Sequence, residues 1–266
     1  MTTMRTSDGT EQQVALRRKL DSSVGWLITT PGACHGGRFF GTDDPELLGW
    51  DTIFDHLAED GLFGFRLLAT EDLPQIEARL SERGFRIDYW NVFSAKANTV
   101  REALRALDLS LPEGYRLIDA ETLTYEDTIR EAQAFMAGNG VAPMSVAMLS
   151  GKHGPCVFIA ITGPDGGIVA TAFSYFPHNV HSPHDDTAWG GLVAVDPEHR
   201  GKGLGVIANA LALRGMIEEK GARAVYELVA EGNEPSRRMV ERCGLSLDTS
   251  VKSGLAMAED AERFTR

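Results

Sequence analysis

The stretch 193–205, VAVDPEHRGKGLG, constrains the fold more than any other part of this sequence. It predicts a strand, a turn, a glycine-rich loop and the start of a helix, in that order. Glycines remove the side chains that would hold a ligand away from the main chain. Several N–H groups can then point at one spot near the positive end of a helix dipole, which suits a pyrophosphate. The loop consists of Arg200, Gly201, Lys202, Gly203, Leu204 and Gly205.

Two well-known phosphate loops do not fit this stretch. A Walker loop requires four residues between its glycines, followed by Gly-Lys-Ser or Gly-Lys-Thr, and no such run follows here. The dinucleotide fingerprint G-x-G-x-x-G would need its third glycine at the position of Val206. The loop is therefore predicted to hold a phosphate ligand of another kind, with a glycine-rich helix start that binds no ligand as the alternative.

The run Arg-Gly-x-Gly-Leu-Gly, after a strand ending in Val-x-Pro, closely resembles the GNAT acetyltransferases. This resemblance implies that the loop holds the pyrophosphate of acetyl-coenzyme A (acetyl-CoA). It also implies a bulge and a splay in the preceding strand, which free main-chain groups for the pantetheine arm and the thioester oxygen. The strand positions that match are Leu192, Val193 and Val195, and the group expected to act at Val193 is its main-chain N–H.

A second motif follows a predicted buried strand at 224–230. The run 233–245, NEPSRRMVERCGL, is similar to the GNAT pattern of Asn, a small residue three later, an amphipathic helix and Gly-Phe. The resemblance implies that Asn233 and Ser236 lie beside the pantetheine arm or the phosphates. Asn233 also suits a helix N-cap, and the two roles are compatible. Val240 departs from the pattern, because many members carry a Tyr there that is usually taken to reprotonate the coenzyme A thiolate.

Composition excludes some classes of protein. The net charge of −12 argues against sequence-independent binding of nucleic acid and is compatible with a cationic amine substrate. Three widely spaced cysteines form neither a disulfide framework nor a zinc ribbon. No apolar run is as long as a membrane span, and the N-terminus lacks a signal-peptide core. These features predict a cytoplasmic protein with no membrane partner.

The chain is predicted to divide near residue 111, with a GNAT domain at 111–266. The expected elements are strands at 115–119, 157–162, 168–176, 189–195, 224–230 and 251–258 and helices at 126–137, after 204 and after 233. The strands at 157–162 and 168–176 are expected to form an antiparallel hairpin. The predicted fold class is thus α+β with a mixed sheet.

The N-terminal region, residues 1–110, is predicted to be a mixture of helices and strands. Strands are expected at 24–30 and 65–69, a helix at 71–83, a strand through Tyr89 and Phe93, and a linking helix at 100–109. The series strand, helix, Gly84-Phe85, strand is similar to the C-terminal half of a GNAT fold, without its glycine loop. Two interpretations stay open: a degenerate partial GNAT repeat, or an unrelated extension that shapes the acceptor pocket.

Attack on a thioester requires a neutral amine, so a general base is expected. Glu227 is the first candidate, because strand alternation can point it toward the acceptor; an edge-facing or salt-bridged Glu is the alternative reading. His184 with its two neighbouring aspartates forms a second group. Tyr226 and Tyr175 are candidate acids in place of the missing Tyr.

His178, His181 and His184 recur at every third residue beside Asp185 and Asp186. Histidine and carboxylate suit zinc or iron, but prolines break any helix that would align the three rings. A polar loop at the rim of the acceptor site is the better interpretation, and no metal is expected.

The resemblance implies an N-acetyltransferase that moves an acetyl group from acetyl-CoA to a primary amine by direct attack in a ternary complex. A small-molecule acceptor is expected, with a protein amine as the alternative, and a homodimer is an open possibility. The rival function is an acyl-CoA-binding sensor or assembly module that has lost turnover, which Val240 favours.

Overall fold

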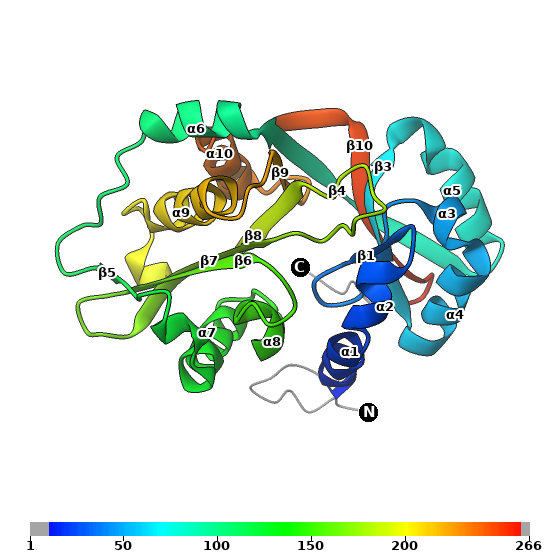
Figure 1. The fold of residues 1–266 in the computed structure, drawn as a ribbon, viewed down its shortest axis with the longest axis horizontal. Coiled ribbons are helices and arrows are strands. Elements are labelled where there is room, and N and C mark those ends of the chain that lie inside the picture. Colours follow the sequence, from blue (N-terminus) through cyan, green and yellow to red (C-terminus); the bar gives the residue numbers. More distant parts are fainter. Residues whose placement is uncertain (1–10, 262–266) are drawn as a thin grey trace.

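The computed structural model describes residues 11–261. Its core is one ten-stranded mixed sheet with helices on both faces, which confirms the predicted α+β class (Figure 1). The elements of the first part are α1 (Glu11–Ser22), α2 (Val24–Thr29), β1 (Ala33–His35), β2 (Phe40–Thr42), α3 (Pro45–Leu48), α4 (Trp50–Asp60), β3 (Leu62–Ala69), α5 (Leu73–Ser81), β4 (Phe85–Lys96) and α6 (Ala97–Arg105).

The second part follows the predicted order of strands and helices. Its elements are β5 (Arg116–Leu117), α7 (Glu126–Gly138), α8 (Val146–Leu149), β6 (Cys156–Thr162), β7 (Ile168–Tyr175), β8 (Thr187–Val195), α9 (Leu204–Glu218), β9 (Ala224–Val229), α10 (Glu234–Arg242) and β10 (Ser246–Ala258). The predicted hairpin is present, since β6 pairs antiparallel with β7. Figure 1 shows α6, α9 and α10 on one face of the sheet, and α7 and α8 on the other.

Helix α9 is held by the apolar face that its sequence predicts. Leu204, Ile207, Ala208 and Leu211 recur at i, i+3, i+4 and i+7, and all four are buried against residues of β6 and β7. This packing fixes the N-terminus of α9, and hence the glycine loop, at the end of β8.

The sheet order is β1-β2-β3-β10-β4-β9-β8-β7-β6-β5, so the two parts of the chain exchange strands. The unit β3–α5–β4 places its last strand beside β9, and the unit β9–α10–β10 places its last strand beside β3. The pairing is also similar in the two units. The last residue of β3, Ala69, pairs with Val251 of β10, and the last residue of β9, Val229, pairs with Asn91 of β4. The helices α5 and α10 both end before a glycine of positive φ, Gly84 and Gly244. This two-fold relation is what a partial repeat would produce.

The sheet curls strongly. Strands β3 and β8 are separated by β10, β4 and β9, which would put them about 19 Å apart in a flat sheet. The guanidinium carbon of Arg66 on β3 nevertheless lies 5.8 Å from the ring centroid of Trp189 on β8. At the β1 end of the sheet, the main chain of Cys34 pairs in an isolated antiparallel β-bridge with that of His178, which lies in the loop after β7. The inside of this curl is lined by residues of both parts of the chain.

The predicted strand at 24–30 is wrong, because Val24–Thr29 forms helix α2. Valine, tryptophan, isoleucine and threonine favour strands, but tertiary contacts override this preference. Leu27 is buried, and the amide of Asn179 donates to the carbonyl oxygens of Leu27, Thr30 and Ala33 at 2.8–2.9 Å. These bonds satisfy groups that the end of a helix leaves without partners. The other predicted elements are present with shifted ends, and the predicted helix at 71–83 is a short 3-10 turn followed by α5.

None of the helices within residues 11–261 is both long and apolar enough to cross a bilayer.

Candidate functional site

The glycine loop has the backbone that a phosphate cradle needs. Gly201 and Gly203 have φ angles of +78° and +79°, a region that side chains other than glycine rarely enter, and a Cβ on either would have no neighbour within 4 Å. The cradle is therefore open. The amide groups of 201–206 find no acceptor within residues 11–261, and Gly203 is the N-cap of α9. Unpaired N–H groups at a helix N-terminus are suited to an anion.

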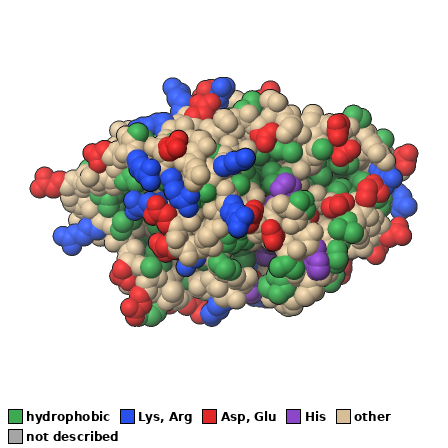
Figure 2. Space-filling view, turned by 45° about the horizontal axis from the view of Figure 1, so that its top comes forward, with side chains coloured by type: hydrophobic (Ala, Val, Ile, Leu, Met, Phe, Trp, Pro, Cys, Tyr) green, Lys and Arg blue, Asp and Glu red, His purple; other side chains and the backbone are tan. Residues whose placement is uncertain are grey.

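The basic side chains of the loop take different positions. Arg200 is exposed, and its Nε donates to the carbonyl oxygen of Val195 at 3.3 Å. Lys202 Nζ lies 2.7 Å from the hydroxyl of Tyr115, which in turn lies 2.8 Å from His199 Nδ1. In Figure 2, Lys and Arg side chains are most frequent over the half of the molecule that carries α6, α9 and α10. Lys and Arg side chains thus gather on the half of the molecule that carries α9, in a chain of net charge −12.

Strand β8 carries the predicted bulge. Leu192 and Val193 together face the single residue Ala172 on β7, and Leu192 has a φ of +51°. The hydroxyl of Thr171 donates to the carbonyl oxygen of Leu192 at 3.1 Å and holds the distorted backbone. A non-glycine residue in this region is uncommon and is frequently found at functional sites.

The predicted splay is also present. β8 and β9 pair in parallel from Thr187 with Ala224 to Gly190 with Glu227, and the pairing stops there. Beyond this point the two strands diverge, with Leu192, Val193 and Val195 along one side of the opening. An extended arm attached to a pyrophosphate on the loop can enter between the strands here.

The second predicted motif lies close to the glycine loop. A Cβ on Gly205 would be 3.9 Å from the sulfur of Met239, so α10 packs beside the start of α9. Asn233 caps α10, its side chain accepting from the amide of Ser236 at 3.2 Å. Asn233 is exposed and Ser236 half-buried, which leaves both within reach of solvent. Val240, where many family members have Tyr, is fully buried in the core under α9.

Glu227 and Tyr226 are neighbours on β9, so their side chains point to opposite faces of the sheet. Glu227 is 3% exposed, and its Oε1 accepts from the side-chain amide of Asn209 in α9 at 2.6 Å. Burial raises the pKa of Glu227 to about 7. Its carboxyl group thus lies beneath α9, and not on the inner face of the curl where Tyr226 lies.

Tyr226 belongs to a buried chain of polar groups inside the curl. Its hydroxyl lies 3.3 Å from His178 Nε2, and His178 Nδ1 lies 2.6 Å from Asp43 Oδ2. Burial raises the pKa of Tyr226 and lowers that of His178, the latter against the effect of Asp43. Burial also opposes the charge of Asp43, but bonds from His178 and Ser182 outweigh it and keep that pKa below its ordinary value. In the neutral form of His178 that carries its proton on Nδ1, Nδ1 donates to Asp43 and Nε2 accepts from Tyr226.

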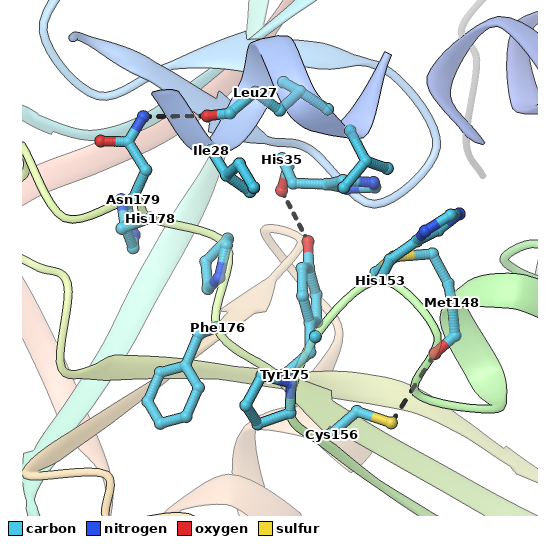
Figure 3. A pocket seen from close by; sticks show the side chains of 14 residues that line it. Leu27, Ile28, His35, Met148, His153, Cys156, Tyr175, Phe176, His178 and Asn179 are labelled. Atoms are coloured by element: carbon cyan, nitrogen blue, oxygen red, sulfur yellow. Dashed lines mark hydrogen bonds between the residues drawn. The ribbon is translucent and has the colours of Figure 1, made fainter. Parts of the chain in front are cut away.

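A pocket that is partly open to solvent has His178, a member of this chain of polar groups, in its lining. Figure 3 shows its lining, which comes from α2, β1, α8, the start of β6 and the segment after β7. Tyr175 points into the pocket, and its hydroxyl donates to the carbonyl oxygen of His35 at 2.7 Å. His178 lines the pocket as well and contacts Tyr226 behind it. The pocket therefore borders the inner face of the curl.

Further apolar and polar side chains lie around this region. Phe135, Met136 and Met144 pack in the same cluster as Tyr175 and Tyr226. His181 and Asp185 are exposed, and His184 lies near His178 with ring centroids 5.4 Å apart. No group of three His, Cys, Asp or Glu side chains suited to a metal ion is found within residues 11–261. The pattern of residues 178–186 gave no sign that one histidine binds a carboxylate of the N-terminal region.

Sequence reasoning did not identify Asp43, His35 or Arg66 as members of the site. Each stands in the N-terminal region, and only the curl of the sheet brings them to Tyr175, Trp189 and Tyr226. The one signal in the sequence was the charge of Arg66 within an otherwise apolar predicted strand.

Comparison with known proteins agrees with this geometry. The model of the Acetyltransferase (GNAT) family matches residues 121–245, and no curated protein matches the sequence. A GCN5-related N-acetyltransferase from Kribbella flavida is 17% identical with a TM-score of 0.56, over 92% of this chain and 96% of that one. The X-ray structure of a Drosophila protein is 15% identical with a TM-score of 0.56, over 94% and 89%. The chain therefore has the GNAT fold, and its residues 121–245 match the model of the acetyltransferase (GNAT) family.

Proposed function

We propose that this protein transfers the acetyl group of acetyl-CoA to the primary amine of a small molecule. The observation that supports this most directly is the continuity of three features at one end of β8: the open glycine cradle, the bulge at Leu192 and the splay from β9. Together they provide an anion site, unpaired main-chain groups and an opening between strands. An acyl-CoA needs all three, for its pyrophosphate, its pantetheine arm and its thioester.

The residues that would hold acetyl-CoA are those of the loop 200–205, the splayed strand 192–195, and Asn233 and Ser236 at the start of α10. The bound coenzyme supplies an activated acyl carbonyl. Hydrogen bonds that the strand forms to the developing oxyanion, together with the positioning of both reactants, provide most of the rate enhancement expected.

Tyr226 is the residue we assign to proton transfer. It accepts a proton from the ammonium form of the acceptor while it passes its own to His178 Nε2, and Asp43 stabilises the resulting imidazolium. The freed amine forms the new N–C bond as the C–S bond breaks, and a proton of the attacking nitrogen goes to the thiolate. Since Glu227 faces α9 and Asn209, we assign it no contact with the acceptor.

A small acceptor fits better than a protein side chain. Tyr226 is fully buried, Trp189 is 8% exposed, and the N-terminal region covers the inner face of the curl. The pocket of Figure 3 is the entry route that we assign to the amine, because its lining includes His178, the hydrogen-bond partner of Tyr226. The rival function, a sensor that binds acyl-CoA without turnover, is favoured by the buried Val240 in place of Tyr.

Calorimetric titration with acetyl-CoA tests the cradle, with Gly203→Asp as the disrupted variant. Gly221→Asp is the matched control, because Gly221 has a similar φ of +82° and equally open surroundings but lies beyond the other end of α9. We expect micromolar binding that Gly203→Asp abolishes and Gly221→Asp retains. No binding to the wild-type protein would contradict the proposal.

Thiol release across a panel of small amines then separates an enzyme from a sensor. Release with at least one amine supports the transferase. Tight coenzyme binding without release, across chemically diverse amines, supports the sensor instead.

A further inference from the structure

Arg66 is a buried charge without a carboxylate partner. Arg66 is 5% exposed, and its Nη2 donates to the carbonyl oxygen of Gly36 at 2.9 Å. Its Nε–H has no hydrogen-bond partner within residues 11–261. No ion pair of Arg66 is found in that range. Burying a guanidinium is costly unless its donors are satisfied, so an arginine in this state is rare without a function.

Trp189 presents a second unsatisfied donor beside the first. Trp189 is 8% exposed, and its Nε1–H also lacks a partner among the described residues. The guanidinium carbon of Arg66 lies 5.8 Å from the centroid of this ring and 5.8 Å from that of Phe39. Two buried N–H donors, one of them charged, therefore belong to side chains that stack on each other, and neither donor has an acceptor within residues 11–261.

The backbone of β3 is distorted where Arg66 stands. Arg66 and Leu67 together face the single residue Ser253 on β10, and Leu67 has a φ of +51°, the same value as Leu192 at the bulge of β8. The amide of Leu67 donates to the hydroxyl of Ser253 at 3.1 Å. Bulges re-aim side chains next to active sites, and strain of this kind persists where function requires it.

The surrounding charges are mostly positive. Half-buried Arg38 donates to the carbonyl oxygen of Ala142 at 2.7 Å, and burial together with the nearby charge of Arg66 lowers its pKa to about 10. Asp43, the carboxylate that lies inside the curl with them, is already bound to His178 and Ser182. An anionic ligand would balance the excess positive charge.

We propose that the acceptor amine also carries a carboxylate, which Arg66 and Trp189 bind through Nε–H and Nε1–H. The substrate class is then a small amino acid with an apolar side chain, since Phe173, Tyr175, Leu192 and Leu228 pack in the same cluster as Trp189 and Tyr226. This assignment rests on the proposed transferase function. In this assignment the carboxylate of the substrate lies on the same inner face as Tyr226, and the amine of the substrate lies next to the hydroxyl of Tyr226.

Paired substrates test the assignment. The probes are L-phenylalanine and phenethylamine, L-leucine and isoamylamine, and L-methionine and 3-methylthiopropylamine, each pair differing in the carboxylate. We expect the wild-type enzyme to prefer the amino acids, and Arg66→Met to lower their kcat/KM about 10- to 100-fold, the range of a charged hydrogen bond. The same variant should leave the decarboxylated amines within about threefold.

Two further variants keep the test clear. Trp189→Phe removes the Nε1–H and retains an aromatic ring, so it should weaken the amino acids selectively even if Arg66→Met folds poorly. Arg83→Met is the control, because Arg83 is an exposed arginine stacked on Phe54 in the same N-terminal region. Equal losses for both members of each pair, or a wild-type preference for the decarboxylated amines, would overturn the assignment.

Binding measured without turnover separates the test of the carboxylate site from the test of the transferase activity. Equilibrium dialysis of labelled L-phenylalanine, L-leucine and L-methionine uses protein saturated with coenzyme A. Binding that Arg66→Met abolishes supports the carboxylate site even if no amine is acetylated. Acetylation of the decarboxylated amines alone, with no bound amino acid, supports the transferase and refutes the carboxylate site.

Discussion

The hydroxyl of Tyr226 lies 3.3 Å from Nε2 of His178, and both side chains are buried where the two parts of the chain meet. Tyr226 comes from β9 and His178 from the segment after β7, while Asp43, which binds the other nitrogen of His178, follows β2. Three distant segments thus contribute to one hydrogen-bonded chain. A chain of this kind can carry a proton without a large change of structure.

Removing the hydroxyl of Tyr226 should impair chemistry and leave coenzyme binding intact. We expect Tyr226→Phe to lower kcat by about 100-fold or more, because a positioned acid or base contributes roughly that factor. Asp43→Asn should give a smaller loss, since it weakens the stabilisation of the imidazolium and removes no proton carrier. Steady-state kinetics with calorimetry checks both effects. Tyr125→Phe, at an exposed tyrosine, is the control, and a normal kcat in Tyr226→Phe would rule out our assignment.

Lys202 should contribute its charge to coenzyme binding. Lys202 is exposed. Within residues 11–261, the one hydrogen-bond partner of its ammonium group is the hydroxyl of Tyr115, at 2.7 Å. We expect Lys202→Met to weaken acetyl-CoA binding by about tenfold, equivalent to roughly 1.4 kcal/mol. The loss should shrink at high salt, because ions screen an exposed charge pair. Calorimetry at two salt concentrations measures this, and an unchanged Kd at low salt would contradict it.

Much of the site around the coenzyme could be predicted from the sequence, because local backbone geometry determines it. Glycines at 201 and 203 imply positive φ, and the apolar spacing from Leu204 to Leu211 implies the helix that follows. The cap at Asn233 and the glycine after α10 are equally local. Each of these features depends on residues close together in the sequence.

The acceptor side could not be predicted in the same way, because it arises from the exchange of β4 and β10 and the resulting curl. No pattern near Arg66 indicates that it will meet Trp189, four strands away in the sheet. The error at Val24–Thr29 has a related cause. A distant residue, Asn179, satisfies the carbonyl groups at the end of that helix and allows strand-forming residues to be helical.

The two roles of Asn233 can be separated by measurement. As an N-cap it accepts from the amide of Ser236, and Asn233→Ala should lower the free energy of unfolding by about 1 kcal/mol. Asn233→Asp keeps the cap but adds a negative charge near the phosphates. We therefore expect Asn233→Asp to retain stability and weaken acetyl-CoA binding, as measured by denaturation and calorimetry. Equal coenzyme affinity in all three proteins would show that Asn233 acts only as a cap.

The buried carboxyl group of Glu227 should make stability depend on pH. Its pKa is raised from the ordinary value of 4.5 to about 7, so the unfolded chain releases the proton at a lower pH than the folded protein. The free energy of unfolding therefore falls as pH rises from about 4.5 to 7 and then levels off, by up to roughly 3 kcal/mol from this group. Glu227→Gln retains the oxygen that accepts from Asn209 and carries no charge. We expect this variant to gain stability over the wild-type protein across that pH range, and the exposed control Glu113→Gln to gain none. Urea denaturation at pH 5 and pH 8 measures the difference, and a gain that is the same at both values would show that Glu227 is not the titrating group.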